Sequence, residues 1–256
     1  MRGRSLLVAL VVAALLAAPA GATTWNQRTA AARAYVLNRA GVESFALVDD
    51  RGHIHGYRLR ARAPSASLLK AMALVAYLNL QSVRSRPLND HDRGLLGPMI
   101  RRSDNAAASA VLRTVGSHAM YRVADRADMW DFSFAWPIWG NSTTTARDQA
   151  RFFIKIDRLV PRRHRGYALA VLASIVPSQR WGIPPVHPPS WSIHFKGGWG
   201  SGTGSVTHQS ALMRKGTMRI ALSVLTLANP SHGYGTDTIR GVAARLLERP
   251  LPLAPH

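Results

Sequence analysis

The order of apolar segments along the chain predicts an α/β (α+β) fold in which both chain ends contribute strands to one antiparallel sheet. Two β-type segments lie near the N-terminus and three lie towards the C-terminus, with a long helical pattern between them. Strands so far apart can share a sheet only if the helical block is inserted between them. We therefore expect a sheet flanked by helices, an inserted all-helical part, and a cleft where the two parts meet.

The first half of the chain supplies two strands and several helices. Ala-rich spacing predicts a helix over residues 24–39, and residues 45–49 and 54–58 flank a turn at Asp50-Arg51-Gly52 in the manner of a hairpin. Residues 67–79 are apolar on nearly every face, which indicates a buried central helix. Further helices are predicted at residues 95–102, 106–115, 145–159 and 163–176.

The second half returns to the sheet. A proline-rich loop is expected over residues 182–191, and Gly235 and Thr236 open a last helix over residues 237–247. Between them, β-type runs predict strands at residues 192–196, 205–213 and 218–227.

The N-terminal segment has the pattern of a secretory signal peptide. Arg2 and Arg4 precede an apolar run over residues 6–18, and Ala20-Gly21-Ala22 offers a cleavage site. A membrane anchor is the alternative, but about 13 apolar residues fall short of the roughly 20 that span a bilayer. We expect a secreted protein without a stable membrane span, comprising a signal peptide (1–22), one catalytic domain (23–248) and a loose tail (249–256).

The composition excludes several kinds of site. The chain has no Cys, which removes disulfides, thiolate zinc sites and cysteine nucleophiles. Its 33 Lys and Arg against 13 Asp and Glu give a net charge of +20. Anionic cell-wall polymers, lipid headgroups or nucleic acid could bind such a chain. The basic residues are scattered and lack interleaved aromatic side chains, so solvated helix faces are favoured. No phosphate-binding glycine loop or cofactor motif occurs, and we expect neither a metal nor an organic cofactor.

Two weaker patterns leave alternatives open. His53 and His55 can share one strand face, but two ligands are too few for a metal, and a hairpin surface is favoured. Trp130, Trp136 and Trp139 could line the cleft or pack internally, and packing is favoured.

The first candidate catalytic motif is Ser67-Leu68-Leu69-Lys70. Residues three apart share a helix face, so the Lys70 amine can reach the Ser67 hydroxyl. A serine needs a base to become a nucleophile, and a Lys buried in an apolar helix has a lowered pKa. Ser67 would lie in the first helical turn, whose free N–H groups can stabilise an oxyanion, and Ser65 could cap the helix. Alone, such a match is expected about 0.3 times by chance.

Two further motifs follow in the chain. Ser103-Asp104-Asn105 lies in a break between predicted helices, and about 0.02 such matches are expected by chance. Its alternative interpretation is a turn with an N-cap. Lys196-Gly197-Gly198 ends a β-type run, where paired glycines let another backbone or a ligand approach, although a hairpin turn is the alternative.

In this order the three motifs resemble those of the penicillin-recognising serine hydrolases, and the class A β-lactamase-like branch is most similar. The resemblance covers about residues 40–247 and implies a β-lactamase/transpeptidase-like fold with an acyl-serine intermediate. Flanking residues agree, namely Met99-Ile100, Ala106-Ala107, Thr143-Thr144-Thr145 with Asp148, residues 179–184, and Trp191.

The resemblance implies catalytic roles for four side chains. Ser67 would be the acylated nucleophile and Lys70 its base. Ser103 would pass a proton to the leaving nitrogen, with Lys196 lowering the pKa of its hydroxyl. Asp104 would face inward and fix its loop.

The resemblance also implies the substrate contacts. Asn105 would hold the substrate amide, and Gly197, Gly198 and Trp199 would bind along the strand edge. Backbone N–H groups of Ser67 and Trp199 would form the oxyanion hole.

The sequence departs from class A β-lactamases at the group that activates the hydrolytic water. That group is a Glu on the Ω loop, but the only Glu residues here are Glu43 and Glu248. Asp131 is the sole acid between Asp128 and Asp148, and Asn141 is a polar candidate. We therefore expect slow deacylation unless another group, such as Asp131, activates water.

A second departure concerns recognition of the substrate carboxylate. Gly197 stands where the family usually carries Thr or Ser, and His208 is the nearest cation candidate on the following strand. Three outcomes fit: a hydrolase or transferase for an amide or ester with another end group, a β-lactamase-like protein with slow turnover, and a penicillin- or peptidoglycan-binding protein with little or none. The expected partner is a small-molecule or peptidoglycan-derived substrate.

Overall fold

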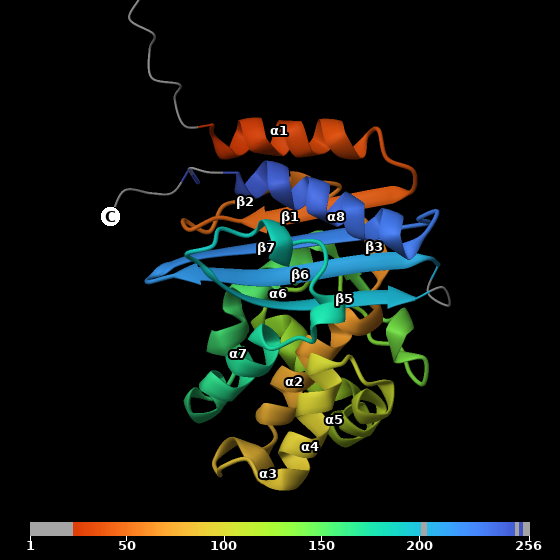
Figure 1. Cartoon of the computed structure of the whole chain (residues 1–256). Helices are drawn as coiled ribbons and strands as arrows, with labels where there is room; N and C mark the ends of the chain where they lie inside the picture. The colour runs from red at the N-terminus through yellow and green to blue at the C-terminus, as the bar shows by residue number, and fades with distance from the viewer. Residues whose placement is uncertain (1–22, 201–203, 249–250, 253–256) are drawn as a thin grey trace, which may run out of the picture.

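A computed structural model describes residues 23–200, 204–248 and 251–252. The predicted signal peptide, and all of the predicted tail except residues 251–252, lie outside these described residues. Helices α1 (Trp25–Val36) and α8 (His232–Leu247) cover one face of a central sheet, and the other helices lie on the opposite face (Figure 1).

The sheet is antiparallel throughout, in the order β2-β1-β7-β6-β5. Strand β1 pairs with β7, with Phe45 opposite Val224, so the prediction that both chain ends build one sheet is confirmed. Strand β5 forms one edge of the sheet. It is longer than predicted because its glycines continue to pair with β6, although glycine has little strand preference. The five strands are β1 (Val42–Val48), β2 (Ile54–Tyr57), β5 (Ser192–Gly200), β6 (Val206–Lys215) and β7 (Met218–Leu227).

A second, two-stranded sheet joins β3 (Arg62–Pro64) to β4 (Thr143–Thr145) and was not predicted. Strands of three residues are too short to show a period in sequence. Thr145 also caps the following helix α6, since its side chain accepts a hydrogen bond from the Asp148 N–H. Because the pairing is antiparallel, with Pro64 opposite Thr143, it brings the chain just before β4 beside the segment that leads to Ser67.

The helical part differs from the prediction mainly at element ends. Helix α5 continues past a kink at Gly116, and α8 starts one turn early because Ser231 caps it. Residues 163–176 divide into two short helices and a loop. The helices of this part are α2 (Leu69–Leu78), α3 (Gln81–Arg84), α4 (Asp90–Arg101), α5 (Asn105–Arg126), α6 (Ala146–Leu159) and α7 (Arg165–Ala173), with 3-10 turns η1 (Ala66–Leu68), η2 (Trp139–Asn141), η3 (Arg162–His164), η4 (Pro177–Gln179) and η5 (Pro184–Val186).

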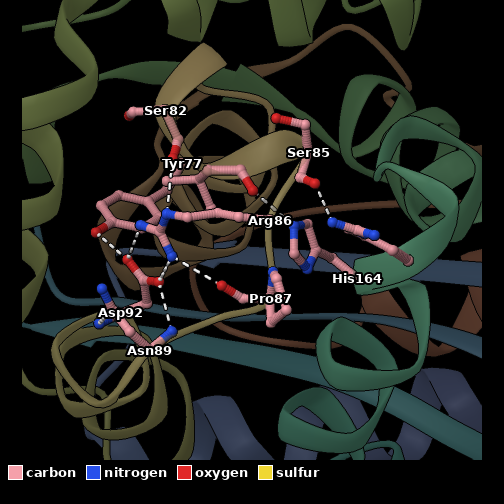
Figure 2. Close-up of polar contacts among 10 residues, drawn as sticks. Tyr77, Ser82, Ser85, Arg86, Pro87, Asn89, Asp92 and His164 are labelled. Atoms are coloured by element: carbon pink, nitrogen blue, oxygen red, sulfur yellow. Dashed lines mark hydrogen bonds and ion pairs between the residues drawn. The ribbon is translucent and has the colours of Figure 1, made fainter.

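Helix α2 is the central helix that the sequence predicts, and all ten of its residues are buried. Its C-terminal end is fixed by Asp92, which accepts hydrogen bonds from the Tyr77 hydroxyl (2.8 Å), the Arg86 guanidinium (2.6 Å) and the Asn89 N–H (2.9 Å) (Figure 2). This network ties α2 to the start of α4. In the part of the chain that the structure describes, no helix is long and apolar enough to cross a membrane.

Candidate active site

The predicted motif residues come from four separate segments at the junction of the sheet and the helical part. Ser67 lies in η1, Lys70 in the first turn of α2, Ser103 between α4 and α5, and Lys196 on strand β5. Figure 1 shows η1 and α2 beneath the β5 edge of the sheet. The fold therefore gathers residues that are far apart in sequence.

Two backbone positions beside the site adopt the left-handed conformation that favours glycine. They are Ala66, with φ of 45°, and Ser103, with φ of 58°. Such a conformation costs a non-glycine residue about 1 kcal/mol or more. At Ser103 it is held by Asp104, whose N–H donates to the Pro98 carbonyl (3.2 Å) and whose carboxylate caps α5 through the Ala107 N–H (2.8 Å). Asp104 thus fixes its loop as an N-cap.

The Ser103 hydroxyl lies between the two lysines. Its Oγ is 3.1 Å from Lys70 Nζ and 3.0 Å from Lys196 Nζ. Lys70 also donates to Asn105 Oδ1 at 2.7 Å, and Lys196 to the Gly197 carbonyl at 2.7 Å. These contacts form one connected polar network, which can carry a proton from one side chain to the next.

Burial favours the neutral amine form of both lysines, compared with a surface lysine. It lowers the pKa of Lys70 to about 7, against a smaller opposing effect of the Asp104 carboxylate. Burial, and then the charge of Lys70, hold the pKa of Lys196 well below its usual value. A neutral amine, which a general base requires, is therefore accessible near neutral pH at this site.

The surroundings of Ser67 differ from the sequence expectation in three respects. Ser67 lies in the 3-10 turn η1 before α2, and Ser65 makes no side-chain cap there. Among the described residues, no hydrogen bond joins the Ser67 hydroxyl to Lys70, whose amine turns to Ser103 and Asn105 instead. Ser67 is 9% exposed and opens onto a cavity of about 540 Å³.

Strand β5 approaches η1 closely, as its paired glycines predict. A Cβ atom on Gly198 would lie 2.9 Å from the Ser67 nitrogen and 3.0 Å from the Leu68 nitrogen. Because β5 is an edge strand, alternate N–H groups on its outer side are not used by β6. The strand edge and η1 can therefore present N–H groups to the same oxygen.

Trp139 forms the wall of the cavity next to Lys70, where sequence analysis favoured internal packing. The Lys70 Nζ atom lies 5.1 Å from the centre of its ring, and its indole N–H donates to Ser109 Oγ at 3.1 Å. Trp136 and Trp130 are exposed and do not line this cavity. No local signal in the sequence distinguishes Trp139 from the other two.

The candidate water-activating groups do not reach the cavity. Asp131 binds Arg60 (2.9 Å) and Arg147 (2.9 Å), and Arg60 holds the pKa of the Asp131 carboxyl below its usual value. The expectation that Asp131 could activate water is therefore wrong in this arrangement. Asn141 is exposed at the end of η2 and does not line the cavity either.

His208 is not the cation that the sequence offered as a candidate. Its Nδ1 accepts a hydrogen bond from the Thr226 N–H (3.1 Å), so that nitrogen is unprotonated, and its Nε2 donates to the Pro64 carbonyl (3.0 Å). Burial lowers the pKa of His208 to about 4, which keeps the ring neutral. Its contacts link β6 to the end of β3.

The two hairpin histidines both contact the Asp49 carboxylate. His55 Nε2 is 2.9 Å from the Asp49 carboxylate, and His53 Nδ1 is 3.5 Å from it. Within residues 23–200, 204–248 and 251–252, no cluster of three or more metal-ligating side chains occurs.

Comparisons with known proteins place this arrangement in a family. The model of the beta-lactamase enzyme family matches residues 93–249. The chain belongs to the beta-lactamase enzyme family. The match includes Ser103, Asn105 and Lys196 but begins after Lys70, so Ser67 and Lys70 are assigned only by their sequence motif and their place in the fold.

Solved β-lactamase structures share the fold. The β-lactamase from Sphaerobacter thermophilus DSM 20745 is 19% identical, with a TM-score of 0.74 over 88% of this chain and 97% of that one. A β-lactamase from Xanthomonas campestris pv. campestris str. ATCC 33913 is 15% identical, with a TM-score of 0.75 over 88% and 98%. PBP-A is 16% identical, with a TM-score of 0.73 over 88% and 96%. The curated proteins contain no match. The predicted superfamily and fold class are confirmed.

Proposed function

We propose that this beta-lactamase family protein is a serine hydrolase that acts through an acyl-serine intermediate. The observation that carries the proposal is the Ser103 hydroxyl held between the amines of Lys70 and Lys196, beside a cavity that Ser67 lines. This arrangement supports the catalytic set of Ser67, Lys70, Ser103 and Lys196. It needs no metal or organic cofactor for the steps below.

Acylation begins when neutral Lys70 takes the proton of the Ser67 hydroxyl. A small side-chain rotation supplies this contact, because the Lys70 amine is turned towards Ser103. The Ser67 oxygen then attacks the substrate carbonyl carbon. The backbone N–H groups of Ser67 and Trp199 donate hydrogen bonds to the carbonyl oxygen, on which negative charge develops.

The intermediate collapses when the bond from the carbonyl carbon to the leaving group breaks. Ser103 gives its hydroxyl proton to the leaving atom and regains one from protonated Lys70, so that Lys70 returns to its neutral form. Lys196 stabilises the Ser103 oxygen during this exchange. Asn105, Gly197, Gly198 and Trp199 hold the substrate against the β5 edge.

Deacylation is the slow step in this proposal. Among the described residues that line the cavity, none is a carboxylate, and Trp139 covers Lys70 on the side of η2. Water must therefore be activated by Lys70 or Ser103 alone, and the acyl-enzyme accumulates. The same observation favours a second candidate function, a penicillin- or peptidoglycan-binding protein that acylates with little or no turnover.

The test is the intact mass of the protein after incubation with a panel of β-lactams and 4-nitrophenyl esters. We expect a mass increase equal to one acyl group, its loss in Ser67→Ala, and its retention in Ser178→Ala, which removes an exposed hydroxyl in η4. An adduct that persists in Ser67→Ala, or no adduct and no turnover with any compound, would contradict the proposal.

We also propose that the protein is exported and acts outside the cytoplasm as a secreted protein. The support is the charged, apolar and small-residue order of residues 2–22. N-terminal sequencing of protein recovered from the culture medium or cell envelope should give Thr23 as the first residue. Recovery of the intact Met1 terminus in the cytoplasm would show that the segment is not processed.

A further inference from the structure

We propose that the cavity beside Ser67 selects uncharged, aromatic acyl groups, so that the substrates are neutral aryl-substituted esters or amides. This proposal rests on the acyl-serine function above and specifies its substrate class. The cavity walls are mainly apolar and include the rings of Trp139 and Trp199 with Pro137 and Ile138. Its polar lining side chains are Ser67, Ser103, Asn105 and Ser109, all of them uncharged.

The uncharged lining contrasts with the rest of the chain. Of the 33 basic residues all but four are arginine, the side chain best suited to bind a carboxylate through two parallel hydrogen bonds. No arginine is among the described residues that line the cavity. A carboxylate in the cavity would lose its hydration without gaining an ionic partner, which disfavours its binding.

The two site lysines do not supply that partner. Both are fully buried beneath the cavity floor, and neither lines it. Their amines are already bound to Ser103 Oγ, and further to Asn105 and the Gly197 carbonyl. A substrate anion would have to break these contacts to reach either amine.

The Trp181 ring occupies the space that a polar side chain at position 197, next to Lys196, would need. A Cβ atom on Gly197 would lie 2.9 Å from the edge of the Trp181 ring. Gln209 holds the backbone that carries this ring, since its amide donates to the Trp181 carbonyl (2.8 Å) and accepts from the Ile183 N–H (2.7 Å). The Trp181 ring in turn packs edge-on against Trp199, with ring centres 5.9 Å apart. The partly buried Trp181 ring therefore supports Trp199, which lines the cavity.

Three 4-nitrophenyl esters that differ only in the acyl group test the proposal. They are the phenylacetate, the cyclohexylacetate and the (4-carboxyphenyl)acetate, and the burst of 4-nitrophenolate measures acylation after correction for hydroxide reactivity. We expect the phenylacetate to acylate about tenfold faster or more than the carboxylate-bearing ester, and severalfold faster than the cyclohexyl ester. Equal rates, or a preference for the carboxylate, would overturn the proposal.

Failure of the substrate assignment is distinguishable from failure of the proposed function. A burst that requires Ser67 but shows no preference among the three esters refutes only the substrate class. A burst that survives in Ser67→Ala refutes the acyl-serine mechanism, and with it the assignment of this cavity as the acyl site.

Two variants probe the wall directly. Trp199→Leu should reduce the preference for phenylacetate over cyclohexylacetate, while Trp130→Leu should not, because Trp130 is 68% exposed and packs on Arg151 outside the cavity.

Ile138→Arg places a cation at a cavity position that is 65% exposed, so folding should tolerate it. It should raise the relative rate of the carboxylate ester severalfold, whereas Leu37→Arg, an equally charged change on exposed surface elsewhere, should not. Unchanged selectivity in both Trp199→Leu and Ile138→Arg would overturn the proposal.

Discussion

The amine of Lys70 lies 5.1 Å from the centre of the Trp139 ring, on the side of the site where η2 packs against η1. An aromatic ring can stabilise a nearby ammonium group but cannot take a proton from water. The groups proposed for acylation lie around this position, whereas no carboxylate that could serve deacylation is among the described cavity residues.

Trp139→Glu should therefore shorten the lifetime of the acyl-enzyme. A carboxylate at this position can act as a general base towards water, a contribution that reaches 100-fold or more when well placed, and we expect about tenfold from an unoptimised position. The measurement is the decay of the acyl adduct by mass spectrometry. Trp139→Gln is the control, since it removes the same ring without adding a base, and equal decay in both variants would contradict this account.

The rate of acylation should rise with pH around the pKa of Lys70. Burial lowers that pKa to about 7, so the amine is mostly protonated below this pH and mostly neutral above it. Only the neutral amine can accept the Ser67 proton, and the burst rate should increase about tenfold per pH unit well below 7 and level off above it. Lys70→Met should abolish this dependence of the burst rate on pH and lower the rate at least 100-fold. A burst rate that is flat from pH 5 to 9 would exclude Lys70 as the base.

Much of the fold follows from local sequence patterns. The sequence predicts β7 with the observed bounds, and it predicts α2 as the central helix because apolar residues cover all its faces. The second half of α5 is missed because Gly116 interrupts the helical pattern, with φ of 67° and ψ of 171°. The small β3–β4 sheet is missed because pairing between distant short segments has no local signal.

The site is predictable only in part for the same reason. Short motifs identify Ser67, Lys70, Ser103 and Lys196, but the contact of Lys70 with Asn105 rather than Ser67 depends on where α5 begins relative to α2. The position of Trp139 depends on the path of the loop before β4. These are relations between elements, and no residue spacing encodes them.

Asp92→Asn should destabilise the helical part of the protein. The Asp92 carboxylate is 1% exposed and binds Arg86 and Tyr77, and the hydrogen bonds from Arg86 lower its pKa to about 2. Loss of the charge should reduce the free energy of unfolding by about 2 kcal/mol. Because the folded-state pKa is lowered, this stabilisation is present above about pH 4 and is lost as the pH falls through about 2.

Urea titration of wild type and Asp92→Asn at pH 7 and pH 2 checks this effect. Asp90→Asn is the matched control, because Asp90 is exposed in the same first turn of α4. A loss at pH 7 that is no larger in Asp92→Asn than in Asp90→Asn would show that the network in Figure 2 contributes little to stability.

Gly198→Ala should impair acylation more than stability. The added Cβ would lie 2.9 Å from the Ser67 nitrogen and 3.2 Å from the Ser65 carbonyl, and these are backbone atoms that cannot rotate away. Strand β5 must then move away from η1, which separates the N–H groups proposed to hold the developing oxyanion. Loss of one such donor typically costs a factor of about 100 or more in rate.

Gly94→Ala is the control, because a Cβ there meets no atom within 4 Å and alanine favours the helix. The burst rate of Gly198→Ala should fall at least tenfold with a melting temperature within a few degrees of wild type, and an unchanged burst rate would show that the β5 edge does not form the oxyanion site.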